Sequence, residues 1–199
     1  LSAMREARER KIAVKGGKFM EAVAQADTIV FDKTGTLTYA TPKLMEIVTF
    51  GDNDPDDMLR LAACLEEHYP HSVANAIVKG AAEKNLSHDE IHSKVKYIVA
   101  HGVSSAVDDK KVVIGSYHFV LEDEGCSIPE GEEEKLNSIN GEYSRIFMGI
   151  SGKLAAILCI FDPIREEARL VIDELHKLGI SKICMMTGDN KKTAEAVAD

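Results

Sequence analysis

Hydrophobic residues recur along this chain with different spacings, and each spacing predicts a different kind of element. Residues 28–31 form a short apolar run that leads into Asp32 and a loop of glycine and threonine, which is typical of a buried strand feeding a loop. Residues 168–178 carry apolar side chains at helical spacing before Gly179, which predicts an amphipathic helix with a glycine end. Residues 183–186 are again a short apolar run followed by a polar loop. Together these segments predict a parallel α/β unit.

Between these segments the pattern is first helical and then alternates with a period of two. Asp54 followed by Pro55 is typical of a helix start, and a second helix is predicted around residues 73–81. Further along, short alternating segments flank residues 108–109 and 151–152, which predicts two β-hairpins. The middle of the chain therefore predicts an α+β domain with an antiparallel sheet.

The simplest domain organisation is one α/β domain interrupted by an inserted α+β domain. Residues 1–41 and 159–199 would form the two parts of the α/β domain, and residues 42–158 would form the insert. Within the insert, the acidic run at residues 132–134 is predicted to be the solvated face of a helix.

Composition excludes several classes of function. The chain has 199 residues, 45% of them hydrophobic and 29% charged, which suits an ordinary buried core rather than disorder. A net charge of −9 argues against a nucleic-acid partner, because phosphate backbones are bound mainly by surplus Lys and Arg. No apolar run approaches the roughly 18–20 residues that cross a bilayer, so these residues are expected to be soluble. The four cysteines lack metal-ligand spacing and are predicted to be reduced thiols.

Asp32 is the candidate centre of the chemistry. Ligands of open parallel sheets bind beyond the carboxyl ends of the strands, where Asp32 and Thr187 are both predicted to lie. A carboxylate there can attack a phosphoryl group, and the hydroxyls of Thr34 and Thr187 can hold the transferred oxygens. The alternative is an aspartate that only ends a strand at a glycine turn.

Three short motifs favour the catalytic interpretation of Asp32. Residues 32–38 read DKTGTLT, which resembles without a mismatch the phosphorylation motif of P-type ATPases. Residues 162–165 (DPIR) resemble the hinge motif D-P-x-R, and residues 187–190 (TGDN) resemble T-G-D-[NK], both in family order. The resemblance covers essentially the whole chain. It implies an incomplete haloacid-dehalogenase-like α/β phosphorylation domain interrupted by a nucleotide-binding domain.

The resemblance also implies catalytic roles for the motif residues. Asp32 would accept the γ-phosphate of ATP, and its carboxylate with the Thr34 carbonyl would hold Mg²⁺. Lys33 belongs to the same motif. Thr187 would contact the phosphoryl group, and Asp189 would support the site.

Asp162 and Arg165 are implied to lie at the hinge beneath the nucleotide. Phosphatases that share this core carry a second aspartate two residues after the nucleophile as general acid, and here that position is Thr34. The resemblance therefore implies a lasting aspartyl phosphate, which suits an ion pump better than a phosphatase.

The short insert resembles the heavy-metal-transporting branch, whose nucleotide site uses an S-E-H-P block, a G-x-G turn and a later glycine. His71 aligns with the histidine beside the adenine, while the glutamate of that block is absent and Glu67 is a substitute. The G-x-G turn keeps its second glycine as Gly102, and Gly115 matches the later one.

The leading hypothesis is the ATP-binding and phosphorylation region of a cation-transporting P-type ATPase, with ATP and Mg²⁺ as cofactors. Both ends of the chain look cut, so membrane helices that bind the cation and an actuator domain are expected as further parts, with this region on the cytoplasmic face. The isolated chain is expected to be nearly inactive. The alternatives are a soluble aspartate-nucleophile phosphatase, disfavoured by Thr34, and a regulatory nucleotide-binding module, disfavoured by the intact DKTGTLT.

Overall fold

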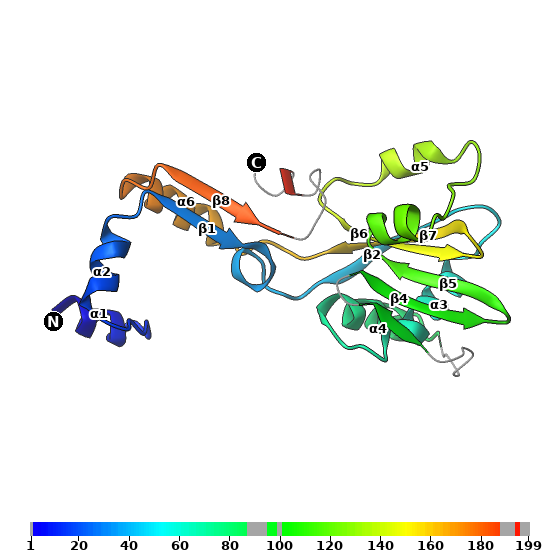
Figure 1. Ribbon diagram of the computed structural model, residues 1–199, viewed down its shortest axis with the longest axis horizontal. Coiled ribbons are helices and arrows are strands. Elements are labelled where there is room, and N and C mark those ends of the chain that lie inside the picture. The colour runs from blue at the N-terminus through cyan, green and yellow to red at the C-terminus, as the bar shows by residue number, and fades with distance from the viewer. Residues whose placement is uncertain (1, 87–94, 99–100, 188–193, 196–199) are drawn as a thin grey trace.

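The computed structural model describes residues 2–86, 95–98, 101–187 and 194–195 (Figure 1). The molecule is elongated, with a small parallel strand pair towards one end and a larger antiparallel sheet at the other. Its elements in chain order are α1 (Ser2–Glu9), α2 (Gly17–Ala24), β1 (Thr28–Asp32), η1 (Lys33–Leu37), β2 (Lys43–Thr49), α3 (Pro55–Glu66), α4 (Ser72–Glu83), β3 (Lys96–Ile98), β4 (Gly102–Val107), β5 (Lys110–Gly115), η2 (His118–Asp123), α5 (Glu133–Ser138), β6 (Ser144–Ile150), β7 (Lys153–Phe161), α6 (Ala168–Lys177) and β8 (Lys182–Met186).

The first and last parts of the chain form the predicted parallel unit. Strands β1 and β8 pair in parallel, with Asp32 opposite Met186 at their carboxyl ends. Helix α6 lies alongside this pair in Figure 1 and ends before Gly179, whose φ of 95° suits a residue without Cβ. The parallel α/β prediction is confirmed, and this topology places Asp32 and Thr187 at the same edge.

The middle of the chain forms the predicted antiparallel sheet. Within the described residues, six strands pair in the order β2-β7-β6-β5-β4-β3. Asp108 and Asp109 join β4 to β5 with φ of 49° and 61°, and Ser151 and Gly152 join β6 to β7 with φ of 50° and 77°. Positive φ at both central residues is the turn geometry whose twist matches a tight hairpin. Both hairpin predictions are confirmed.

Helices cover both faces of this sheet, and each face has its own core. Leu65 of α3 and Ile77 of α4 are fully buried in a cluster with Leu158 of β7. Phe119 of η2 is buried in a second cluster with Ile157, the neighbour of Leu158 on the same strand. Since successive strand residues point to opposite faces, the interior strand β7 supports both cores.

Local signals set the start of α3. The Asp54 carboxylate accepts hydrogen bonds from the backbone N–H groups of Asp56 at 2.9 Å and Asp57 at 3.1 Å, and Pro55 occupies the first helical position. The predicted N-cap is confirmed.

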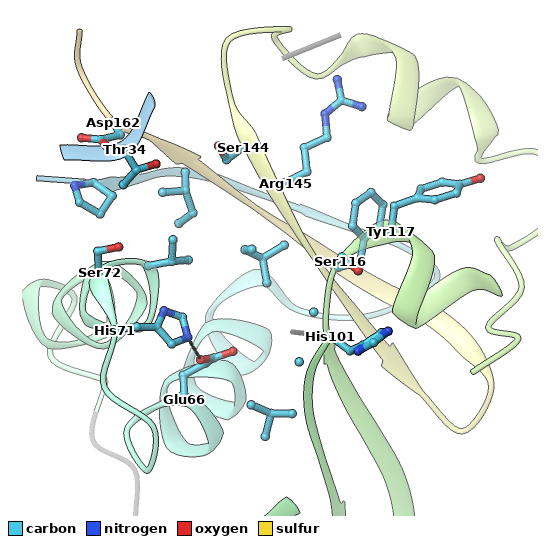
Figure 2. A pocket seen from close by; sticks show the side chains of 18 of the residues that line it. Thr34, Glu66, His71, Ser72, His101, Ser116, Tyr117, Ser144, Arg145 and Asp162 are labelled. Atoms are coloured by element: carbon cyan, nitrogen blue, oxygen red, sulfur yellow. Dashed lines mark ion pairs between the residues drawn. The ribbon is translucent and has the colours of Figure 1, made fainter. Parts of the chain in front are cut away.

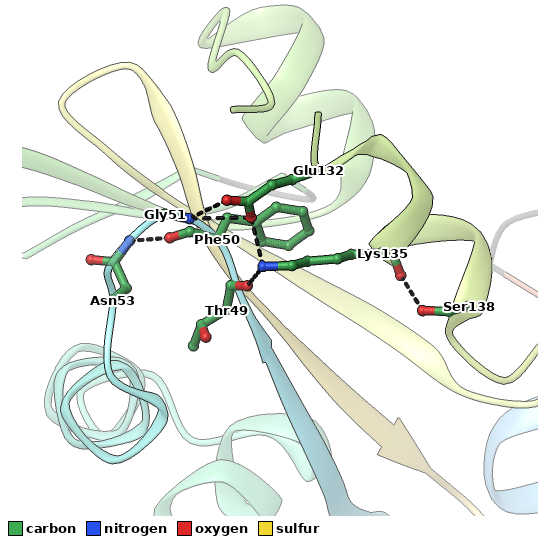
Figure 3. Close-up of polar contacts among 7 residues, drawn as sticks. All are labelled: Thr49, Phe50, Gly51, Asn53, Glu132, Lys135 and Ser138. Atoms are coloured by element: carbon green, nitrogen blue, oxygen red, sulfur yellow. Dashed lines mark hydrogen bonds and ion pairs between the residues drawn. The ribbon is translucent and has the colours of Figure 1, made fainter. Parts of the chain in front are cut away.

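The acidic run at the start of α5 differs from the prediction at one residue. Glu133 and Glu134 are exposed as expected, but the Glu132 carboxylate accepts from Gly51 N at 3.1 Å and from Lys135 Nζ at 2.7 Å (Figure 3). Lys135 Nζ also donates to Thr49 O at 2.9 Å. Glu132 therefore ties α5 to the turn after β2, a long-range contact that a run of like charges does not reveal.

None of the helices in the described ranges combines the length and the apolar character that crossing a membrane requires.

Candidate active site

A cavity of about 700 Å³ lies where the loop after β1, the α3–α4 connection and the antiparallel sheet meet (Figure 2). Its volume falls within the range of small-molecule binding sites. The predicted site residues that line it are Lys33, Thr34, His71, Gly102, Gly115 and Asp162. These residues come from both predicted domains, so the fold brings the phosphorylation motif and the nucleotide motifs to one space.

The loop that follows the carboxyl end of β1 lies at one end of this cavity. Asp32 is exposed at the end of β1, and Thr187 follows Met186, its partner on β8. Lys33, which follows Asp32, is only 6% exposed and lines the cavity with Thr34. Asp32 itself is not among the described residues that line the cavity. Asp189 lies outside the described residues.

Thr38, the last residue of DKTGTLT, connects this loop to the hinge. Its side chain is 1% exposed, and its hydroxyl accepts from Gly35 N at 3.1 Å and donates to Asp162 Oδ2 at 2.6 Å. Gly35 has φ 78°, which lets the loop turn before Thr38. The motif therefore contains its own structural anchor.

Residues of the hinge motif also hydrogen-bond to the backbone of residues 38–41. Asp162 Oδ1 accepts from Thr41 N at 3.0 Å, and Arg165 Nε donates to Thr38 O at 3.1 Å. The Arg165 guanidinium lies 5.0 Å from the Tyr39 ring centroid, a cation–π contact. Asp162 reaches the cavity, whereas Arg165 lines a separate hollow beside α6. Both Asp162 oxygens already hold donors of the protein.

At the other end of the cavity, His71 and Glu66 face one another. His71 precedes α4, and its Nδ1 accepts from Ala74 N at 3.2 Å, which directs the protonated Nε2 toward Glu66 (Figure 2). The distance from Nε2 to Glu66 Oε2 is 3.4 Å. Glu66 is 4% exposed, and within the described residues its Oε2 makes no hydrogen bond. Burying a polar atom without a hydrogen bond costs free energy of folding, so such an atom beside a cavity indicates a binding site.

Burial also changes the protonation of this pair. It raises the pKa of Glu66 to about 7 and lowers the pKa of His71. Both shifts favour neutral groups, because burial penalises the charged form of each. At neutral pH the pair is therefore poised between a carboxylate and a carboxylic acid beside a neutral imidazole.

Glu66 is the residue that the sequence reasoning missed. Glu67, the predicted substitute, is exposed and is not among the described residues that line the cavity, whereas Glu66 is. The available signal was helical phase, since Glu66 follows Ala62 by four residues on the buried face of α3. A charged side chain on an apolar stripe is the pattern that identifies it.

Gly102 and Gly115 are opposite one another in the β4–β5 pairing. A Cβ on Gly102 would lie 2.0 Å from Ile114 O, and a Cβ on Gly115 would lie 2.2 Å from His101 O. The resemblance to the heavy-metal branch assigned these glycines to the nucleotide site. The close approach of the two strands is by itself enough to require them.

Comparisons with known proteins agree with the motifs. The haloacid dehalogenase-like hydrolase family matches residues 26–199. The chain is 34% identical over 196 residues to a probable copper-exporting P-type ATPase V of Mycobacterium tuberculosis, covering 96% of this chain and 24% of that protein. It is 40% identical over 188 residues to a copper-exporting P-type ATPase of Legionella pneumophila, covering 94% and 25%. The chain thus spans about a quarter of the length of these relatives.

Solved structures show the same likeness. The catalytic domain of the CPx-ATPase CopB-B, studied for conformational changes upon nucleotide binding, matches with a TM-score of 0.70 and 26% identity over 100% of this chain and 67% of that one. A zinc-transporting PIB-type ATPase in the E2.Pi state matches with a TM-score of 0.58 and 26% identity over 93% and 29%. The resemblance to the catalytic region of heavy-metal P-type ATPases and the predicted fold class are confirmed.

Proposed function

This chain belongs to the haloacid dehalogenase-like hydrolases, and from that membership we propose that it is the ATP-binding and aspartyl-phosphorylation region of a heavy-metal-transporting P-type ATPase. One observation carries the proposal. A single cavity joins the residues that follow Asp32 to His71 and the buried Glu66. Such a space suits a ligand with a polar heterocycle at one end and a transferable phosphoryl group at the other.

The division of the chain into residues 1–41, 42–158 and 159–199 is part of this proposal. In support of the first boundary, the antiparallel sheet begins at Lys43. Its strand β7, however, continues to Phe161. The second boundary would then fall inside a strand that leads directly into the hinge motif.

We assign the adenine to the Glu66–His71 end of the cavity. Adenine presents an amino donor and ring-nitrogen acceptors. With a pKa of about 7, Glu66 can accept from the amino group as a carboxylate or donate to a ring nitrogen as an acid. An adenine bound there would supply the hydrogen bond that Glu66 Oε2 lacks within the described residues.

At the other end, we assign Asp32 as the nucleophile. One carboxylate oxygen would attack the γ-phosphorus as the bond to the bridging oxygen breaks, and ADP would leave with that electron pair. The Thr187 hydroxyl would donate to the transferred oxygens, and Asp189 would support it. The Asp32 carboxylate and the Thr34 carbonyl are hard oxygen donors of the kind that Mg²⁺ prefers, and the ion would neutralise phosphate charge when bound.

The rest of the proposal concerns the full-length protein. We propose that this region lies on the cytoplasmic face of a membrane and acts with an actuator domain and with membrane helices that hold the transported cation. Copper export by the sequence relatives and zinc transport by a structural neighbour make a transition metal the expected cargo.

The phosphorylation step is tested on the full-length protein with γ-labelled ATP and Mg²⁺. We expect a hydroxylamine-sensitive label that Asp32→Asn abolishes, while the isolated chain labels poorly or not at all. Nucleotide binding without any label in the full-length protein would support the regulatory-module alternative instead. Stoichiometric labelling of the isolated chain would refute its expected inactivity.

A further inference from the structure

Two tyrosines that the proposed site does not include form a stacked pair at the adenine end of the cavity. Tyr69 lies in the α3–α4 connection, two residues before His71, and Tyr97 lies on β3. Their ring centroids are 4.9 Å apart, and the ring planes differ by 26°. The Tyr69 hydroxyl donates to Val95 O at 3.5 Å, which connects the loop to the start of the edge strand.

The position of Tyr97 in the sheet directs its side chain toward the cavity. Tyr97 pairs with Val103 across β3 and β4, so the two side chains share one face of the sheet. Val103 is 1% exposed, belongs to the core beneath α3 and α4, and lines the cavity. Tyr97 lines the same cavity, yet 42% of its surface is exposed. Tyr97 is therefore on the same side of the sheet as the Glu66–His71 pair.

We propose that Tyr97 is a stacking platform for the nucleobase and that Tyr69 supports it from behind. One face of the Tyr97 ring is covered by Tyr69, and Tyr97 lines the same cavity as Glu66 and His71. A ring that is supported on one face and exposed to a cavity on the other fits a planar heterocycle. This role rests on the proposed binding of ATP and adds a binding residue to it.

Stacking and edge recognition contribute differently to binding. Every nucleobase has a π-face, so Tyr97 would strengthen the binding of any base, whereas the polar edge of the base is read by Glu66. Tyr97 would have no influence on the phosphates, which lie at the opposite end. The platform therefore predicts a loss of affinity that depends on the base being present.

The test is isothermal titration of the chain with ATP and, separately, with inorganic tripolyphosphate. Tyr97→Ala is expected to weaken ATP binding by about tenfold, a typical loss for one base–aromatic stack. Tyr97→Phe keeps the ring and is expected to bind ATP as the unaltered chain does. Tripolyphosphate affinity is expected to be the same in all three proteins.

Tyr117→Ala is the matched control. Tyr117 also reaches the cavity and is 47% exposed, but its ring packs edge-on against Phe147 and points away from His71 in Figure 2. Its removal is expected to change ATP affinity by less than about twofold, because it contributes no stacking face.

The outcomes separate the two proposals. If the unaltered chain binds ATP and Tyr97→Ala binds it equally well, the stacking role is wrong while ATP binding stands. A parallel loss of ATP and tripolyphosphate affinity in Tyr97→Ala also overturns the platform, because it would indicate a change beyond the base. If the unaltered chain and the full-length protein both bind no ATP, the platform falls together with the function it rests on.

Discussion

Two glutamates on the antiparallel-sheet domain show how the same side chain can serve a site or a scaffold. The Glu132 carboxylate accepts from Lys135 and from the backbone of Gly51, and the hydrogen bond from Lys135 lowers its pKa (Figure 3). Within the described residues, Glu66 Oε2 makes no hydrogen bond, and burial raises its pKa to about 7. A satisfied carboxylate stabilises the fold, whereas an unsatisfied buried one marks a place where a ligand is expected.

The sharpest test of this contrast is the pH dependence of stability. Folding raises the pKa of Glu66 from 4.5 to about 7, so between these values the folded state binds more protons than the unfolded state. Stability therefore falls as the pH rises through this window, by about 3 kcal/mol in total. Glu66→Gln removes this loss, and at pH 8 it should be more stable than the unaltered chain by up to that amount.

Urea unfolding at several pH values from 4.5 to 8 measures the effect as a difference between the two proteins. The lowered pKa of His71 acts in the opposite direction below its ordinary value of 6.5, so the two proteins are compared at pH 8, where this imidazole is neutral. Equal stability of the two proteins at pH 8 would mean that the Glu66 carboxylate finds a partner in solution.

The second test compares stability with binding in the same variant. Glu66→Gln should weaken ATP binding by about tenfold, roughly 1.4 kcal/mol, because the carboxylate that recognises the base is gone. Affinity would then fall while stability rises, as at sites where function opposes stability. Titration calorimetry at pH 7.5 measures the first quantity, and a joint fall of both quantities would place Glu66 in the scaffold.

Glu132→Ala should instead lower stability without changing binding, and the effect should be smaller. It removes the acceptor for Gly51 N and Lys135, so Tm should fall modestly while ATP affinity stays unchanged. Because the pKa of Glu132 is lowered in the folded state, its stabilisation is present above pH 4.5 and is lost as the pH falls through the folded value. Thermal melts at pH 7 and pH 3 check this, and a loss of ATP affinity would contradict it.

The smallest expected effect belongs to Glu67→Ala. Glu67 is exposed, so its removal should change neither ATP affinity beyond about twofold nor stability beyond about 0.5 kcal/mol. The same titrations and melts apply. A tenfold loss of affinity would restore Glu67 as the acid of the site and weaken the argument for Glu66.

The sequence predicted best where the signal is local. The Asp54 cap, the two hairpin turns and the strand that ends at Asp32 each depend on a few adjacent residues, and all are present in the structure. Gly102 and Gly115 were found by resemblance. The short distance between the strands that requires them is a property of the β4–β5 pairing and cannot be seen in the sequence.

The misses share a physical cause. Glu66 and Glu132 differ in what folding brings next to them, a cavity in one case and Lys135 with the Gly51 backbone in the other. The stacked partner of Tyr97 likewise comes from a different element. A motif aligned letter by letter cannot supply such neighbours, although the helical phase of α3 would have drawn attention to Glu66.

The hinge has a mechanical consequence. Two segments of the chain connect the parallel pair to the antiparallel sheet, and hydrogen bonds join them (Figure 1). The Thr38 hydroxyl donates to Asp162, and Arg165 N donates to Leu37 O at 2.8 Å. Two segments hydrogen-bonded along their length form a ribbon, which resists in-plane shear but bends and twists more readily. Motion of the two parts would then be a rotation, described by the angle between them. A ligand that contacts both walls of the cavity would fix that angle. Binding would thereby set the orientation of the parallel pair relative to the antiparallel sheet.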